Sequence, residues 1–272
     1  MENYSITINK ELAQRAFDFG RRLGLLDKER FGEVFPEKIL QEINGKLPEY
    51  IDGEIVRIRS FPDRAIARVQ KEISLKYFLE SKRKLLTMRE MLLGEKIVDI
   101  AVDKKLAKRI WGFERPPEVY KHLSQMTTEL DISCNRYEDN EATGQRTMWV
   151  KINGEEIITK TEPFEHYNLW GVINDKLEEK SSDKRFVFFE GIYDSLGMNA
   201  YGIMLINKAA LKLEDNPFIP FYYENNLQLL YKQPVSQKER DEFDRIMDGE
   251  SASNITDSIL KELSNPYQSA AL

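Results

Sequence analysis

Apolar positions in the first half of the chain recur every three or four residues, the spacing that places them on one face of a helix. We therefore expect a largely helical region here. The predicted helices cover residues 7–25, 36–44, 63–93, 103–111 and a stretch that begins at Pro116-Pro117. Gly45 and Gly94 are expected to end the second and third helices, because glycine is favoured just after a helix end.

Between the second and third predicted helices the spacing changes to an alternation. Val56 and Ile58 fall on one face of a strand, while Arg57 and Arg59 fall on the other. A tight-turn signal, Asp52-Gly53, immediately precedes these residues. The pattern therefore predicts a short β-hairpin at this point.

The second half of the chain carries the signals of antiparallel β structure. Asn153-Gly154 separates two alternating stretches, which predicts a hairpin over 146–161. The other predicted elements are a polar loop at 134–145, a helix from Pro163, strands at 186–189 and 201–206, a hairpin at 218–231, and a helix to Asp248 opened by a Ser236/Glu239 capping box.

Together these elements predict an α+β fold, with a helical, basic N-terminal half followed by an antiparallel β-rich, aromatic C-terminal half. Region 1–125 is expected to be mainly helical with one short β-hairpin. Region 126–249 is expected to be α+β with two β-hairpins, and 250–272 to be a polar C-terminal tail. Ten of the chain's 29 aromatic residues lie between 186 and 231, where they are expected to fill a sheet core.

The composition narrows the available chemistry. Among 272 residues there are two histidines, His122 and His166, and one cysteine, Cys134. A Cys₄ or Cys₂His₂ zinc site and a disulfide are thus excluded within one chain. Neither a nucleophile-elbow motif nor a dinucleotide-binding fingerprint is present. We therefore expect no metal, no cofactor and a non-enzymatic function.

Charge is segregated along the chain, although the net charge is only −6. Residues 57–109 contain 15 Lys and Arg against 7 Asp and Glu, a net of +8, which leaves −14 for the rest. Such a block favours contact with nucleic acid or with an acidic partner. The predicted contact residues are Arg57, Arg59, Arg64, Arg68, Lys71, Lys82, Arg83 and Lys84.

These charges also suggest self-association. Acidic segments of a neighbouring copy are expected to meet the basic helix, which would build a head-to-tail homo-oligomer such as a viral or mobile-element structural component. No apolar stretch is long enough for a membrane span, so no membrane partner is expected. The first residues lack the apolar core of a secretory signal, and one cysteine suits a reducing compartment. The expected location is cytoplasmic or virion-associated.

Two short motifs support an alternative, a nuclease of intracellular or phage-defence type. The first, Arg115-x6-His122, resembles the motif of HEPN-type ribonucleases. This resemblance implies an all-helical domain in which the arginine stabilises a charged phosphorane and the histidine transfers a proton. Pro116-Pro117 lies inside the motif, so Arg115 is expected to precede the helix rather than share its face with His122.

The second motif combines Pro62-Asp63 with Glu80-Ser81-Lys82. It is similar to the Pro-Asp…Glu-x-Lys pattern of restriction-type nucleases. This resemblance implies that Asp63 and Glu80 hold Mg²⁺ on adjacent strands, while Lys82 orients water or stabilises charge.

Overall fold

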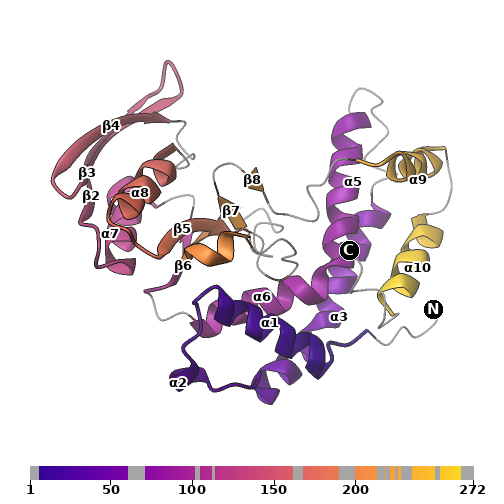
Figure 1. Ribbon diagram of the computed structural model, residues 1–272. Helices are drawn as coiled ribbons and strands as arrows, with labels where there is room; N and C mark the ends of the chain where they lie inside the picture. Colours follow the sequence, from indigo (N-terminus) through magenta and orange to yellow (C-terminus); the bar gives the residue numbers. More distant parts are fainter. Residues whose placement is uncertain are drawn as a thin grey trace. The chain divides into compact units, whose positions relative to one another are not determined.

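The computed structural model describes residues 6–60, 71–101, 105–111, 114–161, 168–189, 200–212, 218, 221–223, 226–227, 235–248 and 252–264 (Figure 1). The chain forms two compact units. The first unit contains the described residues of Met1–Arg15, Phe35–Leu93 and Leu229–Leu272, and the second unit those of Ala16–Val34 and Gly94–Gln228. The regions 1–125, 126–249 and 250–272 stay a prediction of domain organisation.

The described part of the first unit is helical. Its main helices are α3 (Glu37–Arg59), α5 (Lys71–Leu86), α9 (Gln237–Met247) and α10 (Ala252–Leu263), together with the first parts of α1 (Lys10–Arg22) and α6 (Met88–Ala101). α3 packs against α5, α10 contacts both, and α9 contacts α5 (Figure 1).

The predicted hairpin around residue 53 is wrong, because α3 continues through Gly45 and Gly53 to Arg59. Its buried residues keep helical spacing to the end: Leu40, Ile43, Leu47, Ile51, Glu54, Ile55 and Ile58. Val56 is 66% exposed whereas Ile58 is fully buried, so the two residues do not share a face as a strand would require. An apolar stripe long enough to pack along α5 outweighs two glycines that cost about 1 kcal/mol each.

The predicted helix over 63–93 appears as two helices, α5 and α6, joined at Thr87. Residues 63–70 lie outside the described part of the chain. Gly94 lies inside α6 and does not end it. The Arg83 carbonyl accepts from both the Thr87 hydroxyl at 2.9 Å and the Thr87 N–H at 3.0 Å, and the Met91 N–H donates to the Thr87 carbonyl, so the backbone ladder continues across this junction.

The region predicted to be a polar tail contains α10. Ile255, Thr256, Ile259 and Leu263 are buried, and their spacing places them on the helix face that contacts α3 and α5. Residues 252–263 of this region therefore form a helix with one buried face. The apolar positions were too few to predict the helix without its partners.

The second unit combines helices with antiparallel strands, so the chain is α+β. Its elements are α2 (Lys28–Phe31), β1 (Ala107–Trp111), α7 (Pro116–Met126), β2 (Ile132–Asn140), β3 (Gln145–Ile152), β4 (Glu155–Thr161), α8 (Asn168–Glu179), β5 (Lys184–Phe189), β6 (Ala200–Asn207), a 3₁₀ helix (Lys208–Lys212), β7 (Phe221–Tyr223) and β8 (Asn226–Leu227), with the later parts of α1 and α6. The helix predicted for 103–111 is wrong at its end, because 107–111 form β1 and pair with β6.

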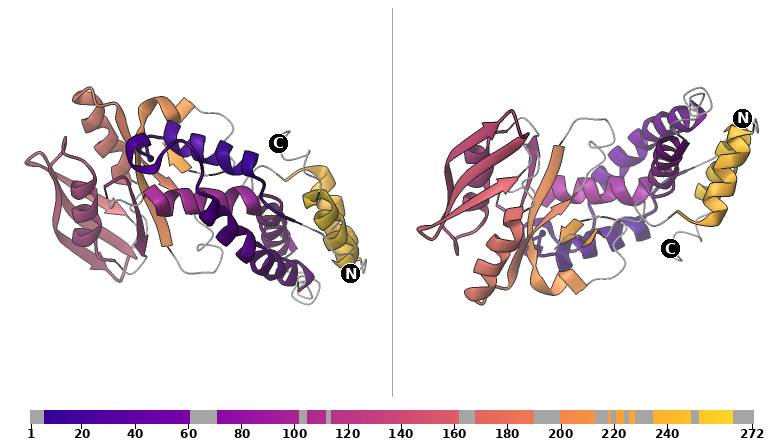
Figure 2. Two further views of the ribbon diagram at one scale, coloured as in Figure 1. Left: turned by 90° about the horizontal axis from the view of Figure 1, so that it is seen from below. Right: turned by 90° about the horizontal axis from the view of Figure 1, so that it is seen from above.

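Two sheets organise this unit. One has the strand order β1-β6-β5-β7-β8 and the other β2-β3-β4. α7 contacts β1 and β2, while α8 contacts β4 and β5, so each helix connects one strand of each sheet. Both views of Figure 2 show α7 against the three-stranded sheet. The core shared by these elements includes Val119, Leu123, Ile132, Val150, Ile173, Leu177, Phe186 and Leu205.

The predicted hairpin at Asn153-Gly154 is confirmed. These residues join β3 to β4 with φ angles of 52° and 86°, the positive values of a two-residue type I′ turn. The predicted polar loop at 134–145 is wrong for 134–140, which belong to β2 and pair with β3, and is confirmed for 141–144, the turn that joins the two strands. β2 is mostly exposed, and its polar sequence forms a strand because β3 supplies a complete partner.

The short hairpin near residue 224 is confirmed where it is described. Tyr222 pairs with Leu227 and Tyr223 pairs with Asn226, while 228–231 lie outside the described part. Phe186 and Phe188 lie in a core, as predicted for this aromatic stretch, but that core is largely aliphatic. The described side chains of 186–231 form no aromatic cluster.

Asn174 of α8 completes the ladder of β5 next to β7. Its side-chain amide donates to the Phe186 carbonyl and accepts from the Phe186 N–H, both at 2.9 Å. Among the described residues, β7 pairs with β5 at Phe188 and Phe189. The Asn174 side chain thus hydrogen-bonds the edge of β5 two residues before this pairing begins.

Candidate functional site

The structure separates the eight predicted contact residues into groups. Arg57 and Arg59 lie in the last turn of α3, and Lys82, Arg83 and Lys84 lie near the end of α5. Arg64 and Arg68 lie outside the described residues. Lys71 begins α5, but its side chain lies outside the described part. Eleven residues of helix separate Lys71 from Lys82, which is roughly 16 Å along the α5 axis.

Lys82 and Arg83 form the most highly organised cationic site among these residues. Lys82 pairs with Glu242 of α9. The Arg83 guanidinium donates to both carboxylate oxygens of Glu239, through Nε at 2.9 Å and Nη2 at 2.8 Å. All four side chains are between 12 and 18% exposed, so both pairs are shielded from bulk water.

Glu239 also holds the start of α9. It accepts from the Ser236 backbone N–H and from the Ser236 hydroxyl, both at 2.8 Å, in the predicted capping box. Burial raises the pKa of this carboxyl, but the bonds from Ser236 and Arg83 together hold the pKa below its ordinary value. The carboxylate therefore stays charged in mildly acidic solution.

Apolar contacts place α9 so that these pairs form. Phe243 and Ile246 are buried, and the Phe243 ring lies 5.6 Å from the Phe78 ring of α5. Glu239, Glu242, Phe243 and Ile246 recur at three- and four-residue spacing and so share one face of α9. α9 thus presents two carboxylates and an apolar patch to α5.

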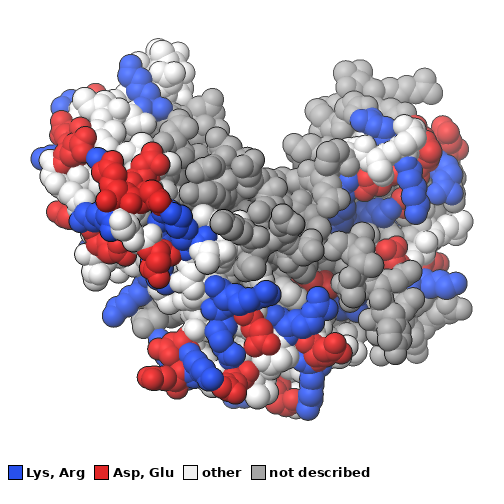
Figure 3. Space-filling view, in the orientation of Figure 1, with Lys and Arg blue, Asp and Glu red and all other residues white. Residues whose placement is uncertain are grey.

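The other described cations of this set differ in their surroundings. Arg57 pairs with the buried Glu54 at 3.2 Å, Lys84 is 6% exposed, and Arg59 is exposed at the end of α3. The face drawn in Figure 3 shows Lys and Arg interspersed with Asp and Glu over its described surface, without a broad basic field. Of the predicted contact residues, Arg57, Lys82 and Arg83 already hold carboxylates.

His122 lies in a second polar cluster. Lys108 Nζ of β1 is 2.6 Å from His122 Nδ1, and His122 Nε2 is 3.1 Å from Glu114 Oε2. Because an ammonium has no acceptor, Lys108 donates to Nδ1, which assigns the ring proton to Nε2 for donation to Glu114. His122 is 19% exposed and Glu114 14% exposed. A line of this kind can pass a proton, as acid–base catalysis requires.

Arg115 precedes α7, as predicted from the two prolines. It is the N-cap residue, and its backbone N–H donates to Glu118 Oε2 at 3.0 Å. The all-helical domain implied by the ribonuclease resemblance is contradicted, because β1 adjoins this site and α7 packs on β2.

The described residues of the second nuclease motif do not lie on the adjacent strands that the resemblance implies. Glu80-Ser81-Lys82 lies within helix α5 and not on a strand, and Asp63 lies outside the described residues. Among the residues that the structure describes, no three His, Cys, Asp or Glu residues are grouped to hold a metal ion. Within the same residues no helix combines the length and apolarity needed to cross a bilayer.

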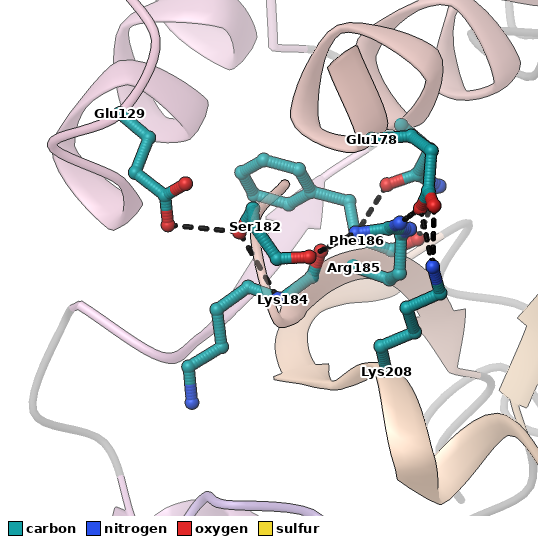
Figure 4. Close-up of polar contacts among 8 residues, drawn as sticks. Glu129, Glu178, Ser182, Lys184, Arg185, Phe186 and Lys208 are labelled. Atoms are coloured by element: carbon teal, nitrogen blue, oxygen red, sulfur yellow. Dashed lines mark hydrogen bonds and ion pairs between the residues drawn. The ribbon is translucent and has the colours of Figure 1, made fainter. Parts of the chain in front are cut away.

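A third polar cluster joins α8 to the five-stranded sheet (Figure 4). Arg185 of β5 is almost fully buried and pairs with Glu178, which also holds Lys208. Arg185 Nη1 donates to the Ser182 carbonyl at 3.0 Å, and the Ser182 hydroxyl donates to Glu129 at 2.8 Å. Each of these groups bonds to another part of the fold, which explains how a guanidinium is tolerated there.

Sequence spacing did not predict the partners of either candidate site. Glu239 and Glu242 carried a signal, because acidic residues three apart beside Phe243 mark a mixed ionic and apolar face. Lys108 carried none, since the packing of β1 against α7 brings it to His122. Glu114 lies just before α7 in the chain, eight residues from His122. Comparisons with protein-family models, curated proteins and solved structures find no match to this chain.

Proposed function

We propose that this chain is a non-enzymatic, nucleic-acid-associated protein that assembles with copies of itself, as a structural component of a virus or mobile element would. The observation that carries the proposal is the geometry of Lys82 and Arg83. These consecutive residues hold two carboxylates, one of them through both oxygens. A guanidinium fork that fits a carboxylate in this way fits a phosphate equally well.

The charge distribution supports the same proposal. Residues 57–109 carry a net of +8 in an otherwise acidic chain, and α5 lies within them. Phosphate contacts by Lys and Arg supply most of the sequence-independent affinity for nucleic acid. The acidic remainder, at −14, offers complementary surfaces to other copies.

Binding to a fluorescein-labelled oligonucleotide, followed by anisotropy across a salt series, tests the proposal. We expect binding that weakens linearly with the logarithm of salt concentration, and Lys82→Ala/Arg83→Ala should reduce the slope by about one to two. Lys38→Ala/Lys46→Ala is the matched control, because it removes two exposed lysines of α3. Absence of salt-dependent binding would contradict the nucleic-acid part, and a strict monomer by light scattering the assembly part.

The Lys108–His122–Glu114 line favours a metal-independent ribonuclease as the second candidate. His122 would transfer protons, with Lys108 and Arg115 available to neutralise phosphate charge. The test is cleavage of labelled RNA in the presence of EDTA. We expect His122→Ala to lose the activity and His166→Ala to keep it. Equal activity in both variants, or no cleavage by the wild type, would exclude this candidate.

A further inference from the structure

We infer that α9 is an internal competitor for nucleic acid: Glu239 and Glu242 occupy Arg83 and Lys82 in place of phosphate oxygens, and nucleic acid gains these cations only when α9 leaves α5. The inference rests on the proposed function and adds its regulation. It starts from the observation that both cations carry carboxylates of a single helix.

The carboxylates resemble phosphate oxygens in the way they are presented. Glu239 meets the Arg83 fork with both oxygens, at 2.9 and 2.8 Å, and Glu242 meets the neighbouring ammonium. Carboxylate and phosphate use the same donors in the same bidentate arrangement. The two acceptors therefore exclude each other at Arg83, and binding of one requires departure of the other.

The N-terminal cap of α9 does not depend on contact with α5. The capping box depends on Ser236, and its bonds to Glu239 do not involve Arg83. Among the described side chains of α9, Phe243 and Ile246 are buried apolar residues, while Lys238, Asp241 and Arg245 are exposed. Loss of the two ion pairs removes two of the contacts that hold α9 against α5.

The decisive experiment compares two double variants that change net charge equally. Glu239→Gln/Glu242→Gln removes the competing charges. Asp241→Asn/Glu262→Gln removes two exposed acidic charges of α9 and α10. By oligonucleotide anisotropy we expect the first pair to tighten binding about tenfold and the second less than about twofold, given what shielded and exposed ion pairs contribute. Adding Lys82→Ala/Arg83→Ala to the first pair should abolish the gain.

The outcomes separate this inference from the function beneath it. Equal tightening by both double variants would attribute the effect to net charge and overturn the inference. Unchanged affinity of Glu239→Gln/Glu242→Gln, with a wild type that binds, would also overturn it. If neither the wild type nor the first pair binds, the proposed function itself fails. If the variants misfold, hydrogen exchange on the wild-type protein, with and without the oligonucleotide, tests the inference instead. Nucleic acid should then lower the protection of α9, and unchanged protection in a bound complex would overturn the inference.

Discussion

Replacement of Glu90 should stabilise the protein at neutral pH. Glu90 is 5% exposed, and its Oε2 atom is buried with no hydrogen-bond partner among the described residues. Burial raises the pKa of this carboxyl, outweighing the hydrogen bond to the Glu90 backbone and the attraction of Arg89 and Arg15. The folded protein thus holds an unfavourable charge and an unpaired oxygen in one side chain.

Two substitutions separate these costs. Glu90→Met removes both, because it keeps a flexible chain of similar length without polar oxygens. A buried unpaired polar group costs about 1–3 kcal/mol, and loss of a carboxylate from the first turn of α6 gives back less than about 1 kcal/mol. The backbone ladder continues from Thr87 into α6, which weakens this helix-end effect further. We expect Glu90→Met to gain about 1–2 kcal/mol and Glu90→Gln to gain less, since an amide still lacks a partner.

Urea denaturation at pH 7 and at pH 4 measures both gains. Because folding raises the pKa of Glu90, its charge penalty is absent below the unfolded value near 4.5 and grows as pH rises through the folded value. The gain of Glu90→Gln should therefore fall toward zero at pH 4. Glu49→Gln, at an exposed position of α3, should stay within about 0.5 kcal/mol of the wild type. Destabilisation by Glu90→Met at pH 7, or a gain for Glu90→Gln that ignores pH, would refute the reasoning.

Three further predictions concern the first unit. Gly45→Ala and Gly53→Ala should each raise the free energy of unfolding by about 0.5–1 kcal/mol in urea denaturation, because both sites are helical and an added Cβ meets nothing within 4 Å. A lower free energy of unfolding would contradict a continuous α3. Phe243→Ala should lower the free energy of unfolding by about 3–5 kcal/mol, or else release α9 from α5, which hydrogen exchange would detect as lost amide protection in α9. A loss below about 1 kcal/mol with the protection of α9 intact would contradict the packing of Phe243. Because folding lowers the pKa of Glu239, the contribution of its charge to stability is complete above pH 4.5 and is lost as pH falls through the folded pKa. Hydrogen exchange should therefore show that acid loosens α9 in the wild type but causes no further loosening in Glu239→Gln.

Local signals predicted the elements whose residues suffice to determine them. The Asn153-Gly154 turn and the Ser236/Glu239 capping box are confirmed because each needs only its own backbone and side chains. The elements that failed depend on pairing partners outside their own residues. β2 is polar and forms a strand only beside β3, and 107–111 is a strand because β6 lies next to it.

The alternation at 56–59 failed for a different reason. Four residues satisfy the strand period and the helix period almost equally, and only the stripe from Leu40 to Ile58 decides between them. The same limit applied to the candidate site. Arg83 was predicted as a contact residue from its charge, but the carboxylate that it holds lies 156 residues away in the chain. Sequence spacing cannot reveal such a pair.

The amide of Asn174 has a consequence for the behaviour of the protein at high concentration. Where β7 ends, the N–H and C=O of Phe186 would otherwise present an unpaired strand edge, the template on which another molecule adds a strand. A single side chain of α8 closes that edge. Resistance of this sheet to aggregation therefore depends on the attachment of α8. Conditions that loosen α8 should expose an unpaired strand edge before the sheet itself unfolds.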